Sequence, residues 1–221
     1  MKKQVLNIFT VLALGLAVVG CKKGAEADTS EAKEAATSES SSSKYAVNTS
    51  ESTIEWKGFK PTGSHNGIIN LDSGTFSVTD STLESGTFII DMTSINSTDL
   101  EGDQKANLDA HLKGTVEGKE GDFFNVAKFP NAAFEITGTT VENGKTMISG
   151  NLALKGIKNN ITFPATITNT GDVMTIISDA FTIDRTKWSI NYGSKSIFDN
   201  LGDKFINDDM ELKISITAKK S

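Results

Sequence analysis

Few side chains in this sequence are suited to chemistry. There are two histidines, His65 and His111, and imidazole is a common general base and metal ligand. Asp109 and Asp122 lie near His111 and could join it in an acid-base or metal site. However, the sequence lacks a compact ligand spacing such as His-Glu-x-x-His. We therefore predict neither a metal site nor a catalytic site, and we expect both histidines to hydrogen-bond backbone groups near one end of the fold.

Arg185 is the only arginine, and two interpretations of it stay open. It follows Phe181 and Ile183 at two-residue steps, which places it on the inward face of a strand or at the rim. There its forked N–H donors would bind a carboxylate or diphosphate head group. Alternatively, it pairs with an internal carboxylate and holds a strand end. We expect Trp188 to lie at the rim beside it.

The segment 108–130 is the one break in a pattern that otherwise predicts strands. Leu108 and Leu112 lie four residues apart and so share one face of a helix, which Asp103 is placed to cap and Gly114 to end. A glycine-rich loop follows, and then three aromatics that need apolar cover, Phe123, Phe124 and Phe129. We expect this connection to cover one end of the fold and to bring His111 toward the opening.

The rest of the folded part alternates apolar and polar residues, as antiparallel strands with one buried face do. In the last such run, Met210 and every second residue to Ala218 are apolar, and the residues between them are polar. Strands with a single apolar face must close into a barrel or pack as a sandwich. The fold class is therefore all-β, with predicted strands at 54–59, 67–71, 74–78, 82–92, 132–141, 146–154, 160–167, 173–183 and 210–218.

Residues 1–20 have the pattern of a lipoprotein signal peptide. Lys2 and Lys3 precede an apolar run that is too short to span a bilayer, and the run ends in Gly20-Cys21. This junction resembles a bacterial lipobox, in which the cysteine is acylated and becomes the new N-terminus. Several acyl chains on Cys21 would hold the protein stably on a membrane. The alternative is an ordinary cleaved signal with a spare thiol.

Composition separates residues 21–43 from residues 44–221. From Lys22 to Ser43 there is no aromatic residue, leucine, isoleucine or valine. Such a segment cannot bury a core, so we expect residues 21–43 to be the lipidated cysteine and a flexible, disordered tether. The net charge is -6, and the folded part has no cluster of Lys or Arg, which argues against nucleic acid as a partner.

Residues 44–221 resemble the YceI-like family of lipid-binding and polyisoprenoid-binding domains in bacterial periplasmic proteins and lipoproteins. The resemblance rests on motifs that occur in order: Trp56-Lys57-Gly58, His65-Asn66-Gly67, Ser94-Ile95-Asn96-Ser97, Asp109-Ala110-His111-Leu112, Asp122-Phe123-Phe124 with Phe129-Pro130, Leu152-Ala153-Leu154-Lys155-Gly156 with Phe163-Pro164, and Phe181-Thr182-Ile183-Asp184-Arg185. Two departures from the family pattern are a longer loop at 114–121 and Thr186-Lys187-Trp188-Ser189 in place of a Phe-Gly pair.

The resemblance implies an extended, eight-stranded, lipocalin-like antiparallel barrel with one or two short helices. Its apolar tunnel would hold an isoprenoid or other long-chain amphiphile, such as a polyprenyl quinone, a polyprenyl phosphate or a fatty amide, and no further cofactor is expected. The residues that we expect to contact this ligand are Arg185, Trp188, His65, His111, Phe123, Phe124, Phe88, Phe163 and Phe181.

Three further expectations concern function and location. We expect a lipoprotein of the cell envelope that faces the periplasm or the surface, with the outer membrane favoured over the inner. The sequence leaves open whether two barrels associate as a homodimer. Two alternatives to lipid carriage also stay open: a hydrolase or isomerase that acts on such a lipid through His65 or His111 with Asp109, and a filled barrel that serves as an interaction module.

Overall fold

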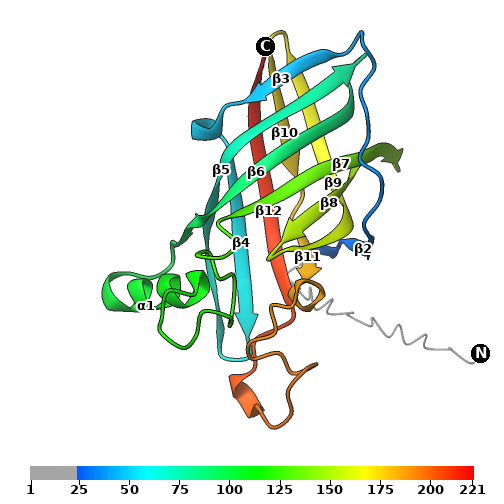
Figure 1. Ribbon diagram of the computed structural model, residues 1–221. Coiled ribbons are helices and arrows are strands. Elements are labelled where there is room, and N and C mark those ends of the chain that lie inside the picture. The colour runs from blue at the N-terminus through cyan, green and yellow to red at the C-terminus, as the bar shows by residue number, and fades with distance from the viewer. Residues whose placement is uncertain (1–23) are drawn as a thin grey trace, which may run out of the picture.

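A computed structural model describes residues 24–221 (Figure 1). Residues 1–23, which contain the predicted signal peptide and Cys21, lie outside the described residues. The strands are β1 Ala25–Glu26, β2 Asp28–Glu31, β3 Ser43–Val47, β4 Thr53–Lys60, β5 Gly63–Thr79, β6 Thr82–Ser97, β7 Asn131–Glu142, β8 Lys145–Leu154, β9 Ile157–Thr170, β10 Val173–Ser178, β11 Phe181–Asp184 and β12 Asp209–Lys220. The helices are α1 Gly102–Lys113 and the short 3₁₀ turns η1 Thr49–Glu51, η2 Arg185–Trp188 and η3 Gly202–Lys204.

Eight of these strands close into a ring. In the order β4-β5-β6-β7-β8-β9-β10-β12, each strand pairs antiparallel with the next, and β12 pairs with β4 to complete the circle. The predicted eight-stranded antiparallel barrel is confirmed. Alternation of residue type explains the closure, because the apolar row of each strand is buried only when a facing row covers it.

Two strand boundaries differ from the prediction. Segments 67–71 and 74–78 form one continuous strand, β5, because an irregularity in the pairing between Leu71 and Ser73 lets the ladder continue. In contrast, segment 173–183 divides into β10 and β11. The chain bends after Ser178, where Asp179 N–H donates to Pro164 O at 3.0 Å, so that β10 pairs with β9 while β11 leaves that strand.

The prediction of a flexible tether is wrong for residues 24–43. β1 pairs parallel with β11, β2 pairs antiparallel with β9, and Ala27 between them is buried. The two short strands therefore fill the gap in the barrel wall between β9 and β11. The segment is too polar to form a core of its own, but its backbone N–H and C=O groups complete strand edges that already exist.

From β2 the chain runs along the outside of the barrel to β3 (Figure 1). The side chain of Asn151, which points outward and is buried, accepts a hydrogen bond from Lys33 N–H at 2.9 Å and donates one to Lys33 O at 2.7 Å. Ala36 N–H donates to Ile136 O, and Glu39 N–H donates to the carboxylate of Glu84. The segment is thus bound along its length by backbone and side-chain hydrogen bonds.

Helix α1 follows β6 and lies at one end of the barrel. Gly114 ends it in the left-handed conformation, with φ 71°, as predicted. The predicted cap was wrong: Glu101 occupies the N-cap position and Asp103 lies in the first turn, since the chain enters the helix at Gly102 with φ 55°. Among residues 24–221, no helix combines the length and the apolar character needed to cross a membrane.

Candidate functional site: an apolar cavity with a polar rim

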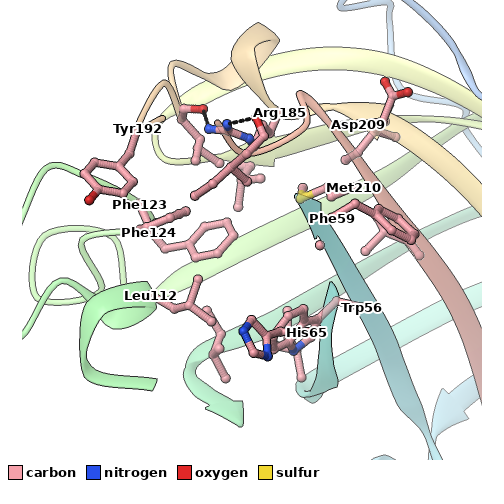
Figure 2. A pocket seen from close by; sticks show the side chains of 18 of the residues that line it. Trp56, Phe59, His65, Leu112, Phe123, Phe124, Arg185, Tyr192, Asp209 and Met210 are labelled. Atoms are coloured by element: carbon pink, nitrogen blue, oxygen red, sulfur yellow. Dashed lines mark hydrogen bonds between the residues drawn. The ribbon is translucent and has the colours of Figure 1, made fainter. Parts of the chain in front are cut away.

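A cavity of about 290 Å³ occupies the barrel end that α1 covers (Figure 2). Its walls come from the inward rows of seven strands, among them Ile69, Ile90, Met92, Leu152, Ile183 and Leu212. Its opening is bordered by α1, the connection from α1 to β7, and the long loop 191–208 that precedes β12. Polar groups therefore gather at one end of a space that is otherwise apolar.

Both histidines line this opening, and each bonds a carboxylate. His65 Nδ1 lies 2.9 Å from Asp99 Oδ2, and His111 Nε2 lies 2.7 Å from Asp122 Oδ2. The prediction that they would bond backbone groups was wrong, because each meets an acidic residue of a neighbouring loop. Burial opposes ionisation of Asp99, but hydrogen bonds from His65 and a backbone N–H outweigh it and lower the pKa of Asp99.

Asp109 belongs to a different cluster. Its carboxylate accepts hydrogen bonds from Ser97 N–H at 2.8 Å, Ser97 Oγ at 2.7 Å and Lys105 Nζ at 2.9 Å. Burial opposes ionisation here too, but these bonds prevail and lower the pKa of Asp109. Asp109 therefore fastens α1 to β6. Within residues 24–221, no three His, Cys, Asp or Glu side chains are grouped so that they could hold a metal ion.

Arg185 is buried and faces the cavity, as strand parity predicted for it. Its guanidinium donates to the carbonyl oxygens of Ile190, Ile206 and Asn207, which lie at the two ends of loop 191–208 (Figure 2). Asp208 Oδ1 is 3.8 Å from Nη2, and burial lowers the pKa of Arg185. Arg185 thus joins the ends of the loop while part of its surface contacts the cavity.

An aromatic cluster joins segment 108–130 to loop 191–208 at the cavity opening. The ring centroids of His111 and Phe123 are 5.0 Å apart, those of His111 and Tyr192 are 4.8 Å apart, and those of Phe123 and Tyr192 are 5.3 Å apart. Phe124 also lines the cavity (Figure 2). The segment 108–130 therefore covers this barrel end as predicted, and Tyr192 connects it to loop 191–208.

Comparison with known proteins identifies this architecture. A sequence profile described as the YceI-like domain matches residues 45–218, which is most of the chain. The chain belongs to the YceI-like family. Curated relatives include the protein YceI of Salmonella arizonae and of Salmonella newport, each 37% identical over 67 residues, or 30% of this chain. The match spans only about a third of the length of these relatives, 32%.

Solved structures share the fold. BcnA of Burkholderia cenocepacia superimposes with a TM-score of 0.60 at 20% identity, over 78% of this chain and 99% of that one. A polyisoprenoid binding domain from Saccharophagus degradans, implicated in plant cell wall breakdown, gives a TM-score of 0.56 at 12% identity, over 80% of this chain and 98% of that one. At these identities the likeness establishes the YceI-like fold alone.

Three phenylalanines that we expected to contact the ligand, Phe88, Phe163 and Phe181, do not line the larger cavity of this YceI-like barrel. Phe88 and Phe163 line a second, apolar cavity of about 50 Å³, and Phe181 lines neither cavity. Phe163 stacks on Phe181 with centroids 4.5 Å apart and meets Phe134 at 5.7 Å. Phe88, Phe134 and Phe181 each lie two positions along a strand from a residue that lines the larger cavity, so these rings form the next layer inside the barrel.

Trp188 does not lie at the rim, where we expected it, and Trp56 lines the cavity instead. Trp188 is fully buried away from the rim, and its Nε1 donates to Leu152 O at 3.0 Å. Turn η2 ends the two-residue alternation, so strand parity no longer applies at Trp188. Trp56, which we did not assign to the ligand, lines the cavity, and its buried Nε1 has no hydrogen-bond partner. Its two-residue spacing from the inward Ile54 was the signal available in the sequence.

Proposed function

We propose that this YceI-like protein binds a single-chain amphiphile, with the apolar tail in the cavity and the head group at the rim. The main support for this proposal is the cavity itself. It offers about 290 Å³ of apolar space that is also lined by histidine, arginine and tryptophan side chains. Transferring each methylene from water into such a space contributes about 0.8 kcal/mol, so a long chain needs few polar contacts. The filled-barrel alternative predicts no such space.

The rim favours a head group that accepts hydrogen bonds. Arg185 lines the cavity, and the three carbonyl oxygens that it binds occupy three of its five N–H donors. A carbonyl, amide or phosphate oxygen of the ligand would accept from the others. Quinone, phosphate and fatty-amide derivatives of long chains all carry such an oxygen. The enzyme alternative is weakened because Asp109 is bound by Ser97 and Lys105 rather than by a histidine.

The polyisoprenoid binding domain that shares this fold supports an isoprenoid as one ligand class. We further propose that the protein acts in the cell envelope, where acyl chains on Cys21 anchor it to a membrane, with the outer membrane favoured. The short apolar run and the Gly20-Cys21 junction support this part of the proposal.

Ala132 provides a test of the cavity. It is buried and lines the cavity from β7, whereas its neighbour Ala133 points outward. Ala132→Phe should fill part of the cavity and weaken uptake of a fluorescent fatty-chain probe at least tenfold, while Ala133→Phe should leave uptake unchanged. Equal probe affinity in the two folded variants would place the ligand elsewhere and overturn the proposal.

A further inference from the structure

Exposed apolar side chains gather on the loop beside the cavity opening. In the described part of the chain, five large hydrophobic residues are strongly exposed: Val141, Ile177, Tyr192, Ile197 and Phe198. The last three belong to loop 191–208, and Ile197 and Phe198 at its tip are about half exposed, at 51% and 50%. Neither tip residue lines the cavity. Two adjacent exposed hydrophobic side chains on one loop suggest a surface that is covered in use.

The loop holds these side chains in a defined place. Phe198 N–H donates to Ser194 O at 2.9 Å, and Ile206 N–H donates to Gly193 O at 2.8 Å. Arg185 binds carbonyls at both ends of the loop, and Tyr192 packs on the cover formed by His111 and Phe123. The tip is therefore rigidly connected to the cavity opening.

We propose that Ile197 and Phe198 insert into the interface of a lipid bilayer and dock the cavity opening onto it. This inference rests on the proposed function, because it names the surface from which the ligand chain enters. Figure 1 shows the loop, in orange, extending past the ends of β4 and β12 at the barrel end where the cavity opens. A bilayer in contact with this tip would lie next to the opening.

The position of Gly24, the first residue that the structure describes, agrees with this orientation. Gly24 N–H donates to the carboxylate of Glu211, two residues along β12 from Asp209, which lines the cavity. Cys21, which lies outside the described residues, precedes Gly24 by three positions in the sequence. An acylated Cys21 would therefore hold this end of the barrel close to the membrane.

The charge of loop 191–208 indicates whether its contact with a bilayer would be electrostatic or apolar. The loop 191–208 carries two lysines and three aspartates, so it lacks the positive charge that attracts anionic lipids. Docking must then come from apolar insertion. We expect binding to uncharged phosphatidylcholine vesicles that changes little with ionic strength.

Tryptophan quenching in the full chain tests the insertion. Phe198→Trp places an indole at the tip, and Val141→Trp places a matched indole on an exposed site at the β7–β8 hairpin. Each variant is reconstituted into phosphatidylcholine vesicles with brominated acyl chains, and the signal of the unsubstituted protein is subtracted. We expect at least threefold stronger quenching at position 198 than at 141. Equal quenching, or none at 198, would overturn the proposal.

A second variant separates this inference from the proposed function. Ile197→Ser with Phe198→Ser should weaken the partition of the loop into vesicles roughly 30-fold, the factor expected from the lost exposed surface of two large side chains. Uptake of the fatty-chain probe from free solution should stay unchanged, whereas uptake from vesicles should slow. A loss of both uptakes would contradict the docking role. A dimer that forms without vesicles and is abolished by these changes would instead identify a second copy as the occupant.

Discussion

Phe163 should limit how deeply a ligand chain enters the barrel. Its ring lines the inner cavity of about 50 Å³, stacks on Phe181 and contacts Phe134. Ile183 and Ala132, which lie two positions from these two rings along their strands, line the cavity of about 290 Å³. Deleting the ring by Phe163→Ala should leave a space on the order of 150 Å³, as engineered core cavities do. The deletion should join the two cavities.

The size of the effect follows from these volumes. The freed space and the inner cavity together, at roughly 30 Å³ per methylene-sized group, accept about six or seven more methylenes. Each contributes about 0.8 kcal/mol, or roughly fourfold in affinity, until the space is filled. The variant should also lose about 3–5 kcal/mol of unfolding free energy, the usual cost of a buried Phe→Ala change.

The assay is the dissociation constant of a series of saturated amphiphiles that share one head group and increase in chain length. We expect affinity to stop rising at a chain about six or seven carbons longer in Phe163→Ala than in the parent. Phe76→Ala is the matched control, because Phe76 is equally buried but lines neither of these cavities. An unchanged length limit in folded Phe163→Ala, or the same shift in Phe76→Ala, would refute the reasoning.

Three other changes test how the cavity is supported. Asp109→Asn should cost about 1–3 kcal/mol of unfolding free energy at neutral pH, because it weakens the hydrogen bonds from Ser97 of β6 and the bond from Lys105 within α1. Since folding lowers the pKa of Asp109, this stabilisation is complete above the ordinary carboxyl pKa of about 4 and is lost as pH falls through the lowered value. Arg185→Lys should lose carbonyl contacts at both ends of loop 191–208 and speed proteolysis within it. Asn151→Ala should speed amide hydrogen exchange at Lys33, since both side-chain bonds to that residue are lost.

Each of these three predictions has a result that would contradict it. A denaturation series that gives the same acid dependence for Asp109→Asn and for the parent would show that the carboxylate does not stabilise the fold through its lowered pKa. Cleavage of loop 191–208 at an unchanged rate in Arg185→Lys would mean that the guanidinium does not order the loop. Unchanged exchange at Lys33 would mean that the side chain of Asn151 does not hold the N-terminal segment.

Local patterns predicted the barrel well. The alternation from Met210 to Ala218 gave both the extent of β12 and its buried face, because period-two burial is a property of one strand alone. Gly114 marked the end of α1 for an equally local reason, since it adopts the left-handed conformation. Arg185 was placed on the inner face by the same parity argument.

Two of the errors depend on partners distant in sequence. Strands β1 and β2 form because β9 and β11 leave edges open, which the polar composition of residues 24–31 does not reveal. The partner of His65 is Asp99, 34 residues away, so its carboxylate contact could not be read from neighbours. Trp188 was misplaced because turn η2 interrupts the strand alternation.

Native mass spectrometry of the full chain, released from its host membrane under mild conditions, shows directly whether the barrel carries a lipid. We expect one bound single-chain amphiphile per barrel, which is lost in Ala132→Phe and retained in Ala133→Phe. A parent protein that carries no lipid and takes up none from added fatty or isoprenoid chains would contradict the proposed function.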